Sequence, residues 1–140
     1  MPATPESTAR TRAFARVIGP WLAIVPGIIV VRMPDMGALA SGFFENPLFA
    51  WFVGGLLLFG GLLIIAFHQY WSNPAAILIS LFGWFLALRG LVLMAMPNLI
   101  ERGAAASMDA MSLVRIGFGA LVLVGLYLSY VGWLAKPRSW

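Results

Sequence analysis

Hydrophobic residues fill four long stretches of the chain, and short polar segments separate these stretches. The stretches run over about residues 14–31, 47–67, 75–96 and 113–135. An α-helix needs about 20 apolar residues to cross a hydrocarbon core of about 30 Å, so each stretch is long enough to span a bilayer. The pattern therefore predicts an all-α, polytopic membrane protein, an up-down bundle of four transmembrane helices with short loops.

The polar segments are too short to form domains of their own. Residues 1–13 are rich in Pro, Ser and Thr and are predicted to be a disordered N-terminal tail, with a second short tail at 136–140. The connection at 68–74 is so short that spans two and three must form an antiparallel hairpin. Residues 97–112 have room for a short interfacial helix, and residues 32–46 are predicted to lie along the membrane surface.

Composition excludes a water-soluble globular protein, because 61% of the residues are hydrophobic and 10% are charged, against roughly 25% charged in soluble domains. The net charge of +4 does not indicate nucleic-acid binding, because the basic residues flank the spans instead of forming one patch. The chain has no cysteine, which excludes disulfides and thiolate metal sites. No complete catalytic, metal or cofactor motif is present, so the sequence predicts a protein that is not an enzyme and holds no cofactor.

The distribution of Lys and Arg predicts the orientation of the spans. Five basic residues flank the outer ends of spans one and four: Arg10, Arg12, Arg16, Lys136 and Arg138. Three lie in the opposite compartment: Arg32, Arg102 and Arg115. An even number of spans puts both termini on one side, and the side richer in Lys and Arg is cytoplasmic. Both termini are therefore predicted to be cytoplasmic.

Small residues form stripes along the spans, and in a bilayer such stripes mark where helix backbones approach one another. On span three one stripe holds Ala76, Ser80, Gly83, Ala87 and Gly90. On span two a similar stripe holds Ala50, Gly54 and Gly61, and His68 continues it. On span four the stripe is looser and holds Gly117, Ala120, Gly125 and Gly132. The stripes predict that spans two and three pack together with His68 facing protein; the alternative is a groove that admits a ligand.

Arg89 is a fixed positive charge inside an otherwise apolar span. It precedes Pro97 by about 12 Å of helix, so its side chain can extend to the lipid head groups. It points away from the small-residue stripe and shares a sector with Phe82 and Phe85. Extension to the surface is one interpretation, and a binding site is the other. In the second case the partner is an anionic lipid, a ligand phosphate, or an acid of this chain: Glu45, Glu101 or Asp109.

His68 and Trp71 form a second candidate, an imidazole and an indole at one membrane surface. A hydrogen-bonded cap of the hairpin, with Trp71 in the aromatic belt, is the simpler interpretation. Ligation of a pigment or haem by His68 alone is the alternative, because a lone histidine cannot complete a zinc site or a bis-histidine haem site. Trp84 lies near mid-bilayer, where its N–H needs an acceptor such as Ser80 or a backbone carbonyl.

Short sequence motifs occur in each of the first three predicted spans. Span one opens with Ala15-Arg16, span two ends in His68-Gln69-Tyr70-Trp71, and span three carries Gly83-Trp84, Arg89-Gly90 and Pro97. Over about residues 13–97 this arrangement resembles a group of small bacterial inner-membrane proteins with no established activity. In that group Asn follows the histidine and Lys precedes the glycine, where this chain has Gln69 and Arg89. The resemblance implies a bacterial inner membrane and no mechanism.

Three classes of function are consistent with these features. The first is a non-catalytic accessory or assembly subunit of a larger inner-membrane complex of respiratory or photosynthetic type, in contact with lipids and other subunits. The alternative is a small transporter or channel that acts as a homo-oligomer, although the spans lack the Asp and Glu residues that line most ion pathways. A membrane enzyme is the third class. Against this class, the only acidic residue on the same side of the membrane as His68 is Glu6.

Overall fold

The computed structural model describes residues 2–136, which form helices and turns and no strand. The elements are, in chain order, α1 (Pro5–Val31), the 3-10 turn η1 (Met33–Asp35), α2 (Met36–Glu45), α3 (Pro47–Phe67), α4 (Pro74–Ala95), α5 (Pro97–Met108), α6 (Met111–Ser129) and the π-helical turn η2 (Tyr130–Leu134). Within the described range four helices are long and apolar enough to cross a membrane: α1, α3, α4 and α6 with η2. The predicted all-α class is confirmed, and the protein is a multi-pass membrane protein.

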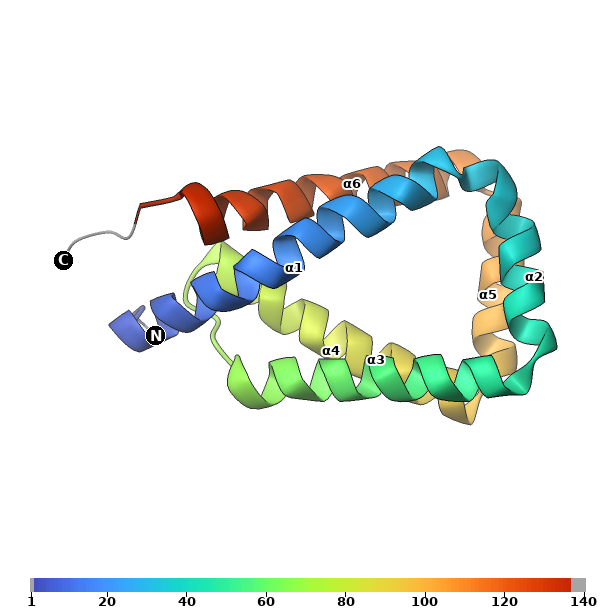
Figure 1. Ribbon diagram of the computed structural model, residues 1–140, viewed down its shortest axis with the longest axis horizontal. Helices are drawn as coiled ribbons and strands as arrows, with labels where there is room; N and C mark the ends of the chain where they lie inside the picture. Colours follow the sequence, from blue (N-terminus) through green and yellow to red (C-terminus); the bar gives the residue numbers. More distant parts are fainter. Residues whose placement is uncertain (1, 137–140) are drawn as a thin grey trace.

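The four spanning helices form two antiparallel pairs (Figure 1). α1 lies beside α6 and η2, and α3 lies beside α4. The pairs meet at the end that holds the start of α1, the end of η2 and the α3–α4 connection, which we call the convergent end. They separate toward the opposite, divergent end, where α2 and α5 pack against each other and form the third side of a triangle (Figure 1).

The α3–α4 pair is built on close backbone contacts. A Cβ atom on Gly61 would lie 2.7 Å from the Gly83 carbonyl oxygen and from the Ala87 Cα, and one on Gly90 would lie 2.6 Å from the Gly54 carbonyl oxygen. No side chain fits at such distances, so glycine lets the two backbones touch. The structure buries all the residues of the two predicted stripes: Ala50, Gly54, Gly61, Ala76, Ser80, Gly83, Ala87 and Gly90. Spans two and three therefore pack together along their length.

The α1–α6 pair uses the same device. A Cβ atom on Gly125 would lie 2.6 Å from the Leu22 carbonyl carbon, and one on Gly132 would lie 2.7 Å from the Arg16 nitrogen. The other two members of the looser stripe, Gly117 and Ala120, are exposed. Span four is thus in close contact with span one through the half of its stripe that lies toward the convergent end.

The N-terminal segment is helical from Pro5, so the prediction of a disordered tail over residues 5–13 was wrong. Thr4 and Ser7 form a capping box, with Ser7 N–H donating to Thr4 Oγ1 at 3.1 Å and Thr4 N–H donating to Ser7 Oγ at 2.9 Å. Pro5 occupies the first helical position, where its missing N–H costs nothing. A polar sequence outside the bilayer can continue a spanning helix, and hydrophobicity alone does not show where it begins. Met1 and residues 137–140 lie outside the described residues.

The segments at the divergent end are helical as well. The interfacial helix expected within residues 97–112 is α5, and the surface segment expected over residues 32–46 is largely α2. The buried apolar core lies toward the convergent end, because residues from all four spanning helices meet there: Ala15, Ile18, Leu22, Ile64, Ala75, Ile79 and Leu128. Packing between the two pairs is thus concentrated at one end of the molecule.

Candidate functional site

His68 lies at the centre of the convergent end and is fully buried. It caps the C-terminus of α3, and its backbone N–H donates to the Ile64 carbonyl at 2.7 Å. Its ring Nε2 lies 3.0 Å from Thr11 Oγ1 on α1, and its ring Nδ1 lies 3.1 Å from Ser80 Oγ on α4. The single histidine therefore joins α1 to both helices of the α3–α4 pair.

The hydrogen bonds assign the tautomer of the ring. Ser80 Oγ–H donates to the Tyr70 carbonyl at 2.9 Å, so the Ser80 oxygen accepts from Nδ1–H of His68. Nε2 is then unprotonated and accepts from the Thr11 hydroxyl. A continuous chain of donors runs from Thr11 through His68 and Ser80 to the backbone of the loop, and it fits the neutral imidazole.

The surroundings of the ring also favour the neutral form. Phe14 and Tyr70 meet the imidazole edge-on, with ring centroids 5.4 Å and 5.2 Å away. Burial lowers the pKa of His68, and the hydrogen bond that involves the His68 backbone opposes this with a smaller effect. The convergent end is thus closed by an uncharged polar network inside an apolar and aromatic shell.

This geometry bears on the ligand roles considered for His68. Both ring nitrogens face hydroxyl groups, so a metal or haem iron on either nitrogen would displace Thr11 or Ser80. Residues 2–136 contain no group of three or more His, Cys, Asp or Glu side chains placed to hold a metal ion. The arrangement favours a structural tie between helices.

Three arginines of α1 donate hydrogen bonds to carbonyl groups at the ends of other helices. Arg10 donates to the Phe67 carbonyl at 3.3 Å, at the C-terminus of α3. Arg12 donates to the Ala135 carbonyl, and Arg16 Nε donates to the Gly132 carbonyl at 2.9 Å, both at the end of α6 and η2. Cations are favourable at helix C-termini, where backbone carbonyls lack partners. The basic residues that predicted orientation therefore also hold the convergent end together.

Trp133 strengthens the Arg16 contact. Its indole N–H donates to the Arg16 carbonyl at 3.2 Å, and the Arg16 guanidinium lies 5.7 Å from the indole centroid. This distance is within the range of a cation–π contact. The C-terminal turn η2 is consequently fixed to α1 by side chains from both partners.

The aromatic candidates lie outside the buried network. Trp71 and Trp84 are 49% and 46% exposed, so both are half turned toward the surroundings of the protein. Ser80, one of the acceptors expected for the Trp84 indole, bonds to His68 and Tyr70 instead. Neither tryptophan is brought together with His68 as a second member of a binding site.

Arg89 lies far from His68, on an exposed part of α4. Phe82, one heptad earlier on the same face, packs against Trp21 of α1 with ring centroids 5.8 Å apart. By helical periodicity Arg89 lies on the face of α4 that carries the Trp21 contact, one heptad farther toward the divergent end. Glu45, Glu101 and Asp109 form no ion pair with Arg89 in the described part of the chain.

Thr11 and the capping role of the arginines are functional features that the sequence pattern missed. Thr11 falls in the segment predicted to be disordered, and no local motif marks it as a partner of a residue 57 positions away. Comparison of the chain with protein-family models, curated proteins and solved structures gave no match. The site is therefore interpreted from its own geometry.

Proposed function

We propose that this protein is a non-catalytic accessory or assembly subunit of a larger membrane complex. The observation that carries the proposal is Arg89, a permanent cation on an apolar helix face, about 9 Å before the end of α4 and without a carboxylate partner among residues 2–136. An arginine at the centre of a membrane helix costs about 2.5–3.5 kcal/mol in insertion scales, and a partner or head group offsets part of this cost.

The position of Arg89 favours a partner subunit as the source of the compensating charge. The Trp21–Phe82 contact sets a register in which Ile28 of α1 and Arg89 of α4 each lie one heptad farther on, in helices that run in the same direction. Ile28 is 53% exposed, and the two pairs separate toward this end of the molecule (Figure 1). A helix carrying a carboxylate that packs on this side of α4 would bury apolar surface and neutralise Arg89 together.

The exposure of the spanning helices agrees with such a role. In the most apolar 18-residue stretch of α6 with η2, only 11% is buried within the chain, against 33% in the corresponding stretch of α4. The exposed side of α6 includes Gly117, where a Cβ atom would have no atom within 4 Å, and the exposed Ala120, three residues farther on the same face. Small residues on an apolar face are typical of helix–helix contacts in membranes, so α6 is the surface of this chain best suited to a second subunit.

We also propose a bacterial inner membrane as the location, with both termini in the cytoplasm. Two sequence features support this: the resemblance to small bacterial membrane proteins and the excess of basic residues at the termini. Both described ends of the chain lie at the same end of the molecule, as an even number of spans requires (Figure 1). Reporter fusions at the two termini test the assignment, and reporters active on opposite faces of the membrane would overturn it.

The partner proposal is tested by purification of the tagged chain from native membranes in a mild detergent, with co-purifying subunits identified by mass spectrometry. We expect a stoichiometric partner that is lost with Arg89→Leu and retained with Arg89→Lys, because a charge contact needs only the cation. Arg102→Leu, which removes an exposed arginine of α5, is the control and should leave the partner bound. A homo-oligomer that conducts ions in vesicles would instead support the channel alternative and overturn the subunit proposal.

A further inference from the structure

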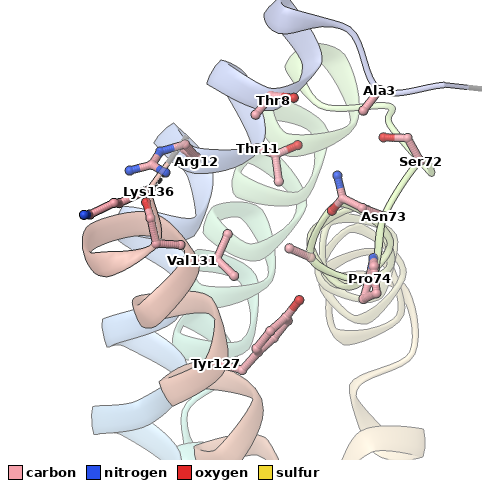
Figure 2. A pocket seen from close by; sticks show the side chains of 12 residues that line it. Ala3, Thr8, Thr11, Arg12, Ser72, Asn73, Pro74, Tyr127, Val131 and Lys136 are labelled. Carbon is pink, nitrogen blue, oxygen red and sulfur yellow. Dashed lines mark hydrogen bonds between the residues drawn. The ribbon is translucent and has the colours of Figure 1, made fainter. Parts of the chain in front are cut away.

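A cavity of about 420 Å³ lies beside the His68 tie, between the two helix pairs (Figure 2). Its walls come from the start of α1, the α3–α4 connection with the start of α4, and the end of α6 with η2. The volume falls in the range of roughly 300–1,000 Å³ that is usual for small-molecule sites. The cavity is therefore large enough for a lipid head group or another small polar ligand.

The polar groups of this cavity are hydrogen-bond donors. Ser72 Oγ is buried and has no hydrogen-bond partner in the described structure. Asn73 Oδ1 accepts from the Ala76 N–H at 2.9 Å, which leaves the Asn73 amide NH₂ to donate elsewhere. Thr8 and Tyr127 add two hydroxyl groups, and Figure 2 shows Thr8 and Ser72 at one end of the cavity and Tyr127 at the other. A group with several acceptor oxygens would satisfy them together.

The charges around the cavity have a single sign. Arg12 and Lys136 line the side formed by α1 and the end of η2, and no Asp or Glu is among the lining residues. The Arg12 guanidinium donates to the Ala135 carbonyl, and the Lys136 side chain extends outward from the rim (Figure 2). These cations attract an anion to the opening, while the hydroxyl and amide groups supply the direct contacts.

We propose that this cavity binds a phosphate ester, the head group of an anionic glycerophospholipid from the leaflet on the basic side. Three observations carry the proposal: an unpartnered buried hydroxyl, a set of donors with no lining carboxylate, and two cations at the rim. The position of the cavity favours a lipid, because its walls come from the ends of spanning helices and lipid head groups lie at this level of the membrane. Val131 and Ala75 add apolar surface to the wall, which suits the start of the acyl chains. The bound lipid bridges both helix pairs.

The sharpest test is Asn73→Asp. Aspartate caps a helix N-terminus as well as asparagine does, so the contact with the Ala76 N–H is kept while a donor is replaced by a negative charge. The matched control is Asn46→Asp at the divergent end, where Asn46 caps α3 through the Leu48 N–H in the same way. Ser72→Ala provides a second variant, because it removes a hydroxyl that makes no hydrogen bond among residues 2–136.

Binding is measured by native mass spectrometry of the full chain in mild detergent, titrated with phosphatidylglycerol and with phosphatidylcholine, whose choline cation opposes Arg12 and Lys136. We expect phosphatidylglycerol to bind wild type and Asn46→Asp at least tenfold more tightly than phosphatidylcholine does. Asn73→Asp should lose at least tenfold in phosphatidylglycerol affinity, and Ser72→Ala a few fold. Equal phosphatidylglycerol affinity of Asn73→Asp and wild type would overturn the proposal. Full displacement of the lipid by inorganic phosphate alone would assign the site to free phosphate and overturn the lipid as its occupant.

Discussion

The convergent and divergent ends of this molecule differ in how the two helix pairs meet. At the convergent end, Thr11, His68 and Ser80 form one buried hydrogen-bonded chain between α1 and the α3–α4 pair. Toward the divergent end, α2 and α5 lie between the pairs, and apolar side chains such as Ile28 on the facing surfaces are exposed. Lipid gives apolar helices little reason to associate, so directional polar contacts decide where the pairs join. The same reasoning leaves the divergent end open to lipid or to another subunit.

The largest expected effect lies within the α3–α4 pair, whose backbones are in close contact along their length. Gly61→Ile should lower the free energy of unfolding by about 3 kcal/mol, because its Cβ would lie 2.7 Å from the Gly83 carbonyl oxygen. Gly60→Ile is the matched control, since a Cβ atom at Gly60 meets nothing within 4 Å. Unfolding in bicelles by denaturant titration measures both variants. Equal losses at the two neighbouring glycines would contradict the close packing of α3 on α4.

The next effect concerns the tie between the pairs. His68→Leu should cost about 2 kcal/mol, because it leaves the Thr11 and Ser80 hydroxyls without their partner in a buried site. In a double-mutant cycle with Thr11→Val, the loss of stability in the double mutant should differ from the sum of the two single losses by about 1 kcal/mol. Strict additivity would show that Thr11 and His68 do not act together.

A smaller effect is the pH dependence of the same tie. Burial lowers the pKa of His68 in the folded protein below its value of about 6.5 in the unfolded chain, so the unfolded chain binds the proton more readily. The contribution of neutral His68 to the free energy of unfolding is therefore fully present above about pH 6.5, and it is lost as the pH falls through the pKa of His68 in the folded protein. Thermal unfolding in micelles between neutral and mildly acidic pH measures the change.

His68→Gln isolates this contribution, because His68 is the only histidine of the chain. The variant should lose the pH-dependent part of the unfolding curve in that range. An unchanged pH dependence in His68→Gln would assign the effect to other groups and contradict the neutral state inferred for the ring.

The smallest effect on stability is expected at the divergent end. Arg89→Leu should change the free energy of unfolding of the isolated chain by at most about 0.5 kcal/mol, because Arg89 is exposed and forms no ion pair among residues 2–136. Its effect belongs to association with a partner, as proposed above. A large loss of stability in the isolated chain would show that Arg89 supports the fold itself and would remove the main argument for a partner subunit.

Hydrophobicity and small-residue spacing predict the spans and the α3–α4 contact because both depend on local sequence. Gly54 and Gly61 repeat on one face of α3, and Gly83 and Gly90 repeat on one face of α4. Small residues that repeat in this way mark close helix packing in a bilayer. The burial of His68 also follows, since it continues the stripe of span two. These features could be predicted without any knowledge of distant contacts.

The separation of the two pairs and the partners of His68 could not be predicted in this way. Thr11 lies 57 residues from His68, in a polar segment whose helicity depends on the Thr4–Ser7 cap and not on hydrophobicity. Arg12 and Arg16 read as orientation signals in the sequence, while their hydrogen bonds to the end of α6 arise only when α1 and α6 are paired. Contacts of this kind are set by tertiary arrangement.

Distances between spin labels in lipid bilayers test the central claim, that the pairs are joined at one end and apart at the other. The chain has no cysteine, so cysteines can be introduced without background at Ala13 with Ile77, near the convergent end, and at Ile28 with Leu91, toward the divergent end. We expect the second distance to exceed the first by about 10 Å or more, the diameter of one helix. Two equal distances would mean that the pairs pack along their whole length, and would contradict this claim.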